Sequence, residues 1–95
     1  MNSEYDKSIH LDGYEIENKE KAIPYLKTEF DLPSYTGSSL DAIADSLSEV
    51  KERVEILLTK KNITYICDHA YAFKVLMMLG NAVNENPNLY IFFRE

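Results

Sequence analysis

The chain has 95 residues, 45% of them hydrophobic and 27% charged, which suits one globular domain and leaves no length for a second core. Ten Lys and Arg against sixteen Asp and Glu give a formal net charge of −6, which disfavours nucleic acid as a partner and favours a basic protein. No apolar stretch approaches the roughly 18 residues of a membrane span, and the polar N-terminus lacks the apolar core of a secretory signal. The single cysteine forms no internal disulfide, so we expect a cytoplasmic protein that does not bind membranes.

The N-terminal part of the chain predicts a strand followed by a helix. Lys7 to Leu11 forms the strand, a turn at Asp12-Gly13 closes it, and residues 1–6 are expected to be a loose tail. The helix is predicted over Pro24 to Phe30. Pro24 belongs in a first turn, because it lacks the N–H that a helix interior needs, so a helix running through from Lys19 is not expected.

A second helix is marked by its cap and by its periodicity. The side chain of Ser38 or Ser39 is expected to cap the helix by accepting a backbone N–H hydrogen bond of its first turn. The apolar residues after the cap recur at helical spacing. Asp41 and Asp45, one turn apart, are expected to face solvent together with Ser48. Four apolar residues at i, i+3, i+4 and i+7 form the buried stripe: Leu40, Ile43, Ala44 and Leu47.

The C-terminal half predicts two more strands, at Val54 to Leu58 and Leu89 to Phe93, the first of them buried on both faces. Between them, Ile63 to Cys67 is expected to be a short helix, with a hairpin to the preceding strand as the alternative, and a long helix follows over about His69 to Asn84. Its buried side is predicted to hold Phe73, Leu76, Met77, Gly80 and Val83. Strands that alternate with helices predict an α/β fold, a single three-stranded parallel sheet packed with three to four helices.

The run Cys67-Asp68-His69 raises the question of an enzyme. Neighbours in sequence rarely form a nucleophile and its base, and no third group orients this pair. Cys67 is more simply a small buried residue and Asp68 the N-cap of the next helix. Two His and one Cys do not complete a zinc site, and three scattered glycines form no nucleotide-binding loop. The sequence therefore predicts no catalytic residue, no metal and no cofactor.

The most specific signal is residues 32–47, which read LPSYTGSSLDAIADSL. Tyr35 lies on a loop bounded by Pro33 and Gly37, beside a helix with two outward carboxylates, Asp41 and Asp45. Carboxylates one turn apart repel by about 0.2–0.5 kcal/mol, which an exposed helix tolerates. On spacing alone, this segment is either a solvated helix of an acidic protein or a binding surface.

The pattern LP-x-Y-x-G-x-x-LDA-x-x-D-x-L resembles the central motif of the barstar family of ribonuclease inhibitors. The resemblance extends from about Ile9 to Phe93 and includes TEFDLP before the motif and NPNLYIFF near the end. It implies one barstar-like domain over residues 1–95, monomeric when free and not an enzyme. It also implies a 1:1 complex in which acidic side chains replace RNA phosphates in the active site of a basic, barnase-like ribonuclease.

The resemblance assigns roles to individual residues. Asp45 matches the central aspartate of the family, and Asp41 matches its partner one turn earlier. Tyr35 matches the loop tyrosine that packs against the enzyme, and Gly37 matches the loop glycine.

Several positions depart from the family pattern. The usual tryptophan between the two aspartates is Ala44, the second loop tyrosine is Thr36, and the asparagine before the leucine is Ser39. Of two acidic positions on the last helix, one matches Glu85 and the other is Asn81, and both could equally be solvated residues. These five positions complete the expected partner-binding set, and the loss of the tryptophan puts specificity for barnase itself in doubt.

Two other function classes stay open on the sequence. A binding module on the same fold could serve a partner that is not a ribonuclease, since one fold hosts several functions. A small enzyme that uses Cys67 and His69 is the third hypothesis.

Overall fold

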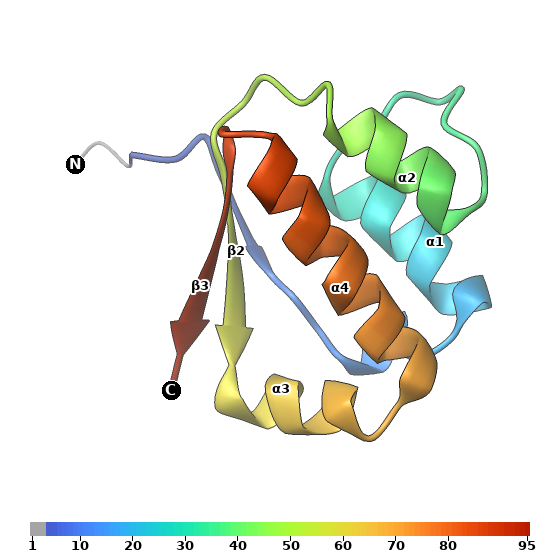
Figure 1. Ribbon diagram of the computed structural model, residues 1–95, viewed down its shortest axis with the longest axis vertical. Helices are drawn as coiled ribbons and strands as arrows, with labels where there is room; N and C mark the ends of the chain where they lie inside the picture. Colours follow the sequence, from blue (N-terminus) through green and yellow to red (C-terminus); the bar gives the residue numbers. More distant parts are fainter. Residues whose placement is uncertain (1–3) are drawn as a thin grey trace.

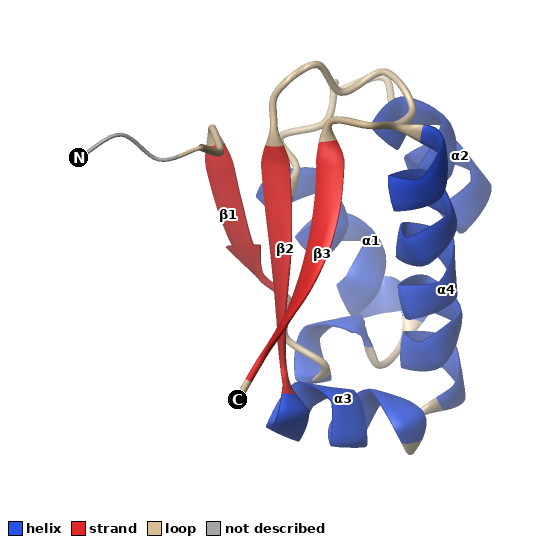
Figure 2. Cartoon of the chain, turned by 60° about the vertical axis from the view of Figure 1, so that its left-hand side comes forward, coloured by secondary structure: helices blue, strands red, loops and turns tan. Residues whose placement is uncertain are grey.

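The computed structural model describes residues 4–95 and contains a three-stranded parallel sheet with three of its helices on one face and a fourth at the end of the central strand (Figures 1 and 2). The fold class predicted from the sequence is therefore confirmed. Within residues 4–95, no helix combines the length and apolar character needed to cross a bilayer. The elements in chain order are β1 Lys7–His10, the 3-10 turn η1 Tyr14–Ile16, α1 Lys19–Glu29, α2 Leu40–Leu47, β2 Val54–Thr59, α3 Lys60–Cys67, α4 Ala70–Glu85 and β3 Leu89–Arg94.

The central strand β2 pairs in parallel with β1 on one side and β3 on the other, so that Ile9, Ile56 and Ile91 lie in register. Alternate residues of β2 face the helices, and Ile56 is fully buried in the core there. Leu57 points to the opposite face, where it is buried outside the main core between His10 and Phe92 of the neighbouring strands. The prediction of a strand buried on both faces thus holds for its centre, although helices cover only one face (Figure 2).

The segment before β1 is attached to the sheet rather than loose over its whole length. Asp6 and Arg53 exchange hydrogen bonds, Asp6 N–H to the Arg53 carbonyl at 2.8 Å and Arg53 N–H to the Asp6 carboxylate at 2.9 Å. The Tyr5 ring packs edge-on against Tyr90 of β3, with ring centroids 5.2 Å apart. The expected tail is therefore wrong for these two residues, while its residues 1–3 lie outside the described part.

Helix α1 begins at Lys19 and passes through Pro24, so the prediction that the proline would start the helix is wrong. The side chain of Asn18 caps the helix by accepting a hydrogen bond from Lys21 N–H at 3.0 Å. Pro24 is exposed and removes one helical hydrogen bond. Burial of the opposite face outweighs that loss, since three residues of α1 lie in the core: Ala22, Ile23 and Leu26.

The segment after β2 is helical, as expected, and forms α3. The buried face of α4, however, differs from the prediction. It consists of Ala72, Val75, Leu79 and Ala82. Phe73 and Met77, which were expected in the core, are 47% and 53% exposed, and Gly80 is exposed as well. Apolar residues occupy nearly all sides of α4, so helical spacing fits two neighbouring stripes, and the stripe with the small alanines is the one that packs closely.

Candidate partner-binding surface

The loop that presents Tyr35 begins with a sharp end to α1. Asp31 adopts a left-handed backbone conformation, with φ 52°, which short polar residues tolerate better than most. Asp31 N–H donates to the Thr28 carbonyl at 3.2 Å and Leu32 N–H to the Lys27 carbonyl at 3.0 Å, the hydrogen bonds of a Schellman motif. The chain is thereby turned away from the helix axis and into the loop.

Thr36 fixes the loop from inside. Its hydroxyl lies 2.8 Å from the Ser46 hydroxyl of α2, its N–H donates to the Pro33 carbonyl at 3.0 Å, and the residue is only 6% exposed. The preceding residue, Tyr35, is 79% exposed. The expectation that Thr36 itself contacts a partner is not supported by this position, because its side chain is an internal anchor for the loop.

Gly37 and Ser39 lead the chain from the loop into α2. A Cβ atom at exposed Gly37 would lie 3.0 Å from the Ala42 Cβ, closer than normal packing allows. Of the two serines considered as caps, Ser39 accepts the hydrogen bond, from Ala42 N–H at 3.0 Å. The helix is anchored below by fully buried Ile43 and Leu47, which sets its outer face towards solvent.

Asp41 and Asp45 are both exposed on α2, as the spacing predicted. Glu85, near the end of α4, is exposed too. In the described part of the chain the only ion pairs join Glu17 to Lys21 and to His69, so none of these three carboxylates is neutralised internally. Each is free to interact with an external cation, from a backbone that is fixed by helical packing.

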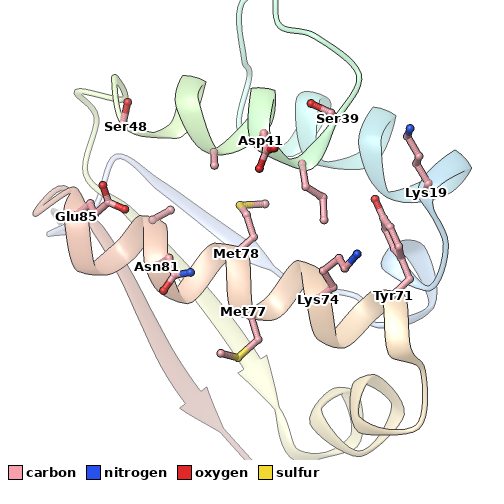
Figure 3. A pocket seen from close by; sticks show the side chains of 13 residues that line it. Lys19, Ser39, Asp41, Ser48, Tyr71, Lys74, Met77, Met78, Asn81 and Glu85 are labelled. Atoms are coloured by element: carbon pink, nitrogen blue, oxygen red, sulfur yellow. The ribbon is translucent and has the colours of Figure 1, made fainter.

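A groove of about 700 Å³ runs between α2 and α4 (Figure 3). Five residues of the expected set line it: Ser39, Asp41, Ala44, Asn81 and Glu85. Tyr35 and Asp45 are exposed outside its lining. The structure thus brings the expected residues of α2 and α4 together along one surface.

The sequence analysis missed a further set of groove residues. Met77 and Met78 lie on α4, and Met77 had been assigned to the core. Lys19 was placed before the first helix, and Lys74 lies on a helix whose exposed face was misassigned. Identifying the residues on α4 requires knowing which of its apolar stripes is buried, and the sequence spacing did not determine that. The lining missed from the sequence is Lys19, Leu40, Ser48, Tyr71, Lys74, Met77, Met78 and Ala82.

At least one residue of the Cys67-Asp68-His69 run has a structural role. Cys67 is exposed rather than buried, and Asp68 is the C-cap of α3 rather than the N-cap of α4, so both residue predictions are wrong. The two ring nitrogens of His69 lie 2.8 Å from the Tyr65 carbonyl oxygen and 3.9 Å from a Glu17 carboxylate oxygen. With both nitrogens directed at these groups, the imidazole is poorly placed to activate the thiol.

Glu17 and Tyr65 form a side-chain hydrogen bond near that histidine. The Tyr65 hydroxyl donates to Glu17, and this hydrogen bond lowers the pKa of the Glu17 carboxyl. The same bond to the Glu17 carboxylate raises the pKa of Tyr65 to about 12. Among residues 4–95 no group of three or more His, Cys, Asp or Glu side chains is placed to hold a metal ion.

The fold and surface define a small acidic α/β protein-binding domain, with unpaired carboxylates on two helices and an exposed tyrosine on the loop before the first of them. The family model described as Barstar (barnase inhibitor) matches residues 7–86, and the chain belongs to this family. Members of the family are inhibitors of barnase-type ribonucleases rather than enzymes. Comparison with curated proteins gives no match.

Proposed function

We propose that this protein is an intracellular inhibitor that binds a basic, barnase-like ribonuclease as a 1:1 complex and blocks its active site. The proposal assigns the contact surface to Tyr35, Asp41 and Asp45, together with the α2–α4 groove. The observation that supports it best is the set of exposed carboxylates with no internal ion pair, on helices whose other faces are buried. Membership of the barstar family supports the same function.

The proposed mode of inhibition is substitution of carboxylates for RNA phosphates. A ribonuclease cleft holds a phosphodiester with cationic hydrogen-bond donors, and those donors bind a carboxylate in the same geometry. A net charge of −6 also attracts a basic enzyme from a distance and speeds its association. Because α2 and its loop are ordered by internal contacts, little conformational entropy is lost on binding.

The test is inhibition of RNA cleavage by a barnase-like ribonuclease, preferably one encoded in the same genome, by wild-type protein and by Asp45→Ala. We expect stoichiometric inhibition by the wild type and a loss of about 2 kcal/mol or more in binding free energy for the variant. That value is the hot-spot threshold at protein interfaces.

The matched control is Asp68→Ala, which removes one exposed carboxylate at the end of α3, outside the proposed surface. It should leave the inhibition constant within about threefold of wild type. An equal loss in both variants would mean that net charge alone drives binding, and an unchanged inhibition constant in Asp45→Ala would remove Asp45 from the site.

A second candidate function is binding of a protein that does not cleave RNA. It is favoured by Ala44 on the groove wall, where the family pattern has a large aromatic residue, because the contact surface then differs in shape. A tight complex with such a protein, formed by folded chain that inhibits no ribonuclease, would establish it.

A further inference from the structure

The α2–α4 groove has an apolar floor that is open to solvent. Ala44 on α2 and Ala82 on α4 are small lining residues that leave space in the groove. Met78 points from α4 towards α2, whereas Met77 points away from α2 (Figure 3). Met77 is 53% exposed, which leaves a flexible, polarisable side chain available for contact. A volume of about 700 Å³ is within the range of ligand sites, so the groove has room for a large side chain from outside.

The two ends of the groove differ in charge. Glu85 lies at one end, Lys19 and Lys74 lie at the other, and Asp41 stands between them on the α2 wall (Figure 3). None of these four groups forms an ion pair within residues 4–95. Lys74 and Glu85 are eleven residues apart on α4, about 16 Å along the helix axis. That distance exceeds the Debye length of about 8 Å at physiological salt, so each end acts on its own neighbour.

We propose that the groove receives a protruding segment of the ribonuclease surface that bears one large apolar side chain. A basic group of the same segment faces Asp41 and Glu85, and an acidic group faces Lys19 and Lys74. This inference rests on the proposed function and makes the groove the part of the surface that selects among ribonucleases. A uniformly basic enzyme surface would be repelled by Lys19 and Lys74. The groove is therefore expected to prefer a ribonuclease whose segment has a basic group at one end and an acidic group at the other.

The groove is continuous with the surface assigned to the enzyme, since Ser39 and Asp41 belong to both. An interface of ordinary size covers about 800 Å² on each partner, so an enzyme bound at Tyr35 and Asp45 would extend over the groove. A second copy of this chain is disfavoured as the occupant, because each copy has a net charge of −6.

The first test fills the groove from its α2 wall with Ala44→Trp and measures the dissociation constant of the ribonuclease complex by titration calorimetry. A partner side chain in the groove would be displaced, so we expect affinity to fall at least about tenfold. Unchanged or tighter binding would show that the groove is not occupied and would overturn the inference. Thermal unfolding checks that the variant is folded, and Ala44→Leu replaces it if it is not.

The second test reverses the charge at the lysine end with Lys74→Glu, with Lys61→Glu on α3 as the control that makes the same change outside the groove. Bulk attraction to a basic enzyme predicts tighter binding for both variants. An acidic partner group opposite Lys74 predicts instead that Lys74→Glu alone weakens binding, by about tenfold. Tighter binding by both variants would overturn the proposed charge order.

Failure of this inference is distinguishable from failure of the proposed function. If Asp45→Ala weakens the complex while Ala44→Trp does not, the inhibitor function holds and the groove assignment falls. If the folded wild-type protein binds no ribonuclease, the proposed function and the inference fall together.

Discussion

The side-chain amide of Asn86 donates a hydrogen bond to the main-chain oxygen of Leu47 at 2.8 Å, which joins the end of α4 to the end of α2. The same amide donates to the Val50 carbonyl at 3.0 Å, and its oxygen accepts from Asn88 N–H at 3.0 Å. Asn86 is 5% exposed. A single buried side chain thus connects the two helices that bear the carboxylates and form the walls of the groove.

Asn86→Ala should therefore lower the free energy of unfolding by about 1–3 kcal/mol, because it removes three hydrogen bonds of a buried side chain. Urea denaturation followed by circular dichroism measures the change. Asn88→Ala is the control: its amide donates to the Val50 carbonyl at 3.2 Å from a half-buried position, so its loss should be smaller. Equal losses in the two variants would contradict a special role for Asn86.

The hydroxyl pair of Thr36 and Ser46 leads to a prediction about the loop. Thr36→Val keeps the shape of the side chain but leaves the Ser46 hydroxyl without its partner, at a cost of about 1 kcal/mol. The double variant with Ser46→Ala should lose less than the two single variants together, since both partners are then removed. If the losses simply add, the two hydroxyls are not energetically coupled.

Gly13 and Gly80 should respond with opposite signs to substitution by alanine. A Cβ at Gly13 would lie 3.0 Å from the Tyr65 ring, 3.2 Å from Ile66 Cγ1 and 3.3 Å from the Asn62 carbonyl oxygen. Gly13→Ala should therefore destabilise the fold by about 1–3 kcal/mol through overpacking. Gly80 lies within α4 with no atom within 4 Å of its added Cβ, so Gly80→Ala should stabilise by about 0.5–1 kcal/mol.

Thermal or urea unfolding of both variants checks this pair. Both glycines have negative φ, so alanine introduces no backbone strain at either site and the sign depends on packing. Stabilisation by Gly13→Ala would show that α3 moves away at little cost. Destabilisation by Gly80→Ala would show that the outer face of α4 is not open.

The order and type of the elements were predictable because local signals agree with one another. A serine cap at Ser38 or Ser39, the periodicity that follows it and the alternation of strands with helices all favour one α/β arrangement. The resemblance of the motif from Leu32 to Leu47 extended this to the family. Asp41 and Asp45 were correctly predicted to be exposed, because the apolar residues of this helix are buried on one side and leave the other side to solvent.

The errors arose where local rules meet tertiary packing. Pro24 suggested a helix start, but burial of the α1 face outweighs one missing hydrogen bond. Phe73 and Met77 were assigned to the core because α4 is apolar on several sides, and only its neighbours decide which stripe is buried. The internal role of Thr36 was also not foreseen, because its hydroxyl has a partner ten residues away in Ser46, which no local pattern indicates.

The Tyr65–Glu17 hydrogen bond makes stability depend on pH at both extremes. Because the pKa of Glu17 is lowered in the folded state, the ionised carboxylate stabilises the fold at pH values above the ordinary pKa of 4.5. This stabilisation is lost as the pH falls through the folded-state pKa. The raised pKa of Tyr65 contributes stability below its ordinary value of 10.0, which is lost between 10.0 and about 12. Tyr65→Phe removes the shared hydrogen bond, and with it the Tyr65 contribution and the largest cause of the Glu17 contribution.

The free-energy difference between wild type and Tyr65→Phe should therefore be largest between 4.5 and 10.0 and should shrink on either side. Urea unfolding at pH values within this range, below it and above it measures the difference, and the ultraviolet titration of the tyrosines should lose its latest component in the variant. Tyr14→Phe is the control, because the Lys21 ammonium lies over the Tyr14 ring and Tyr14 makes no hydrogen bond to Glu17. A difference that stays constant with pH would mean that Tyr65 stabilises the fold by packing alone, against Gly13 and the stacked ring of His69.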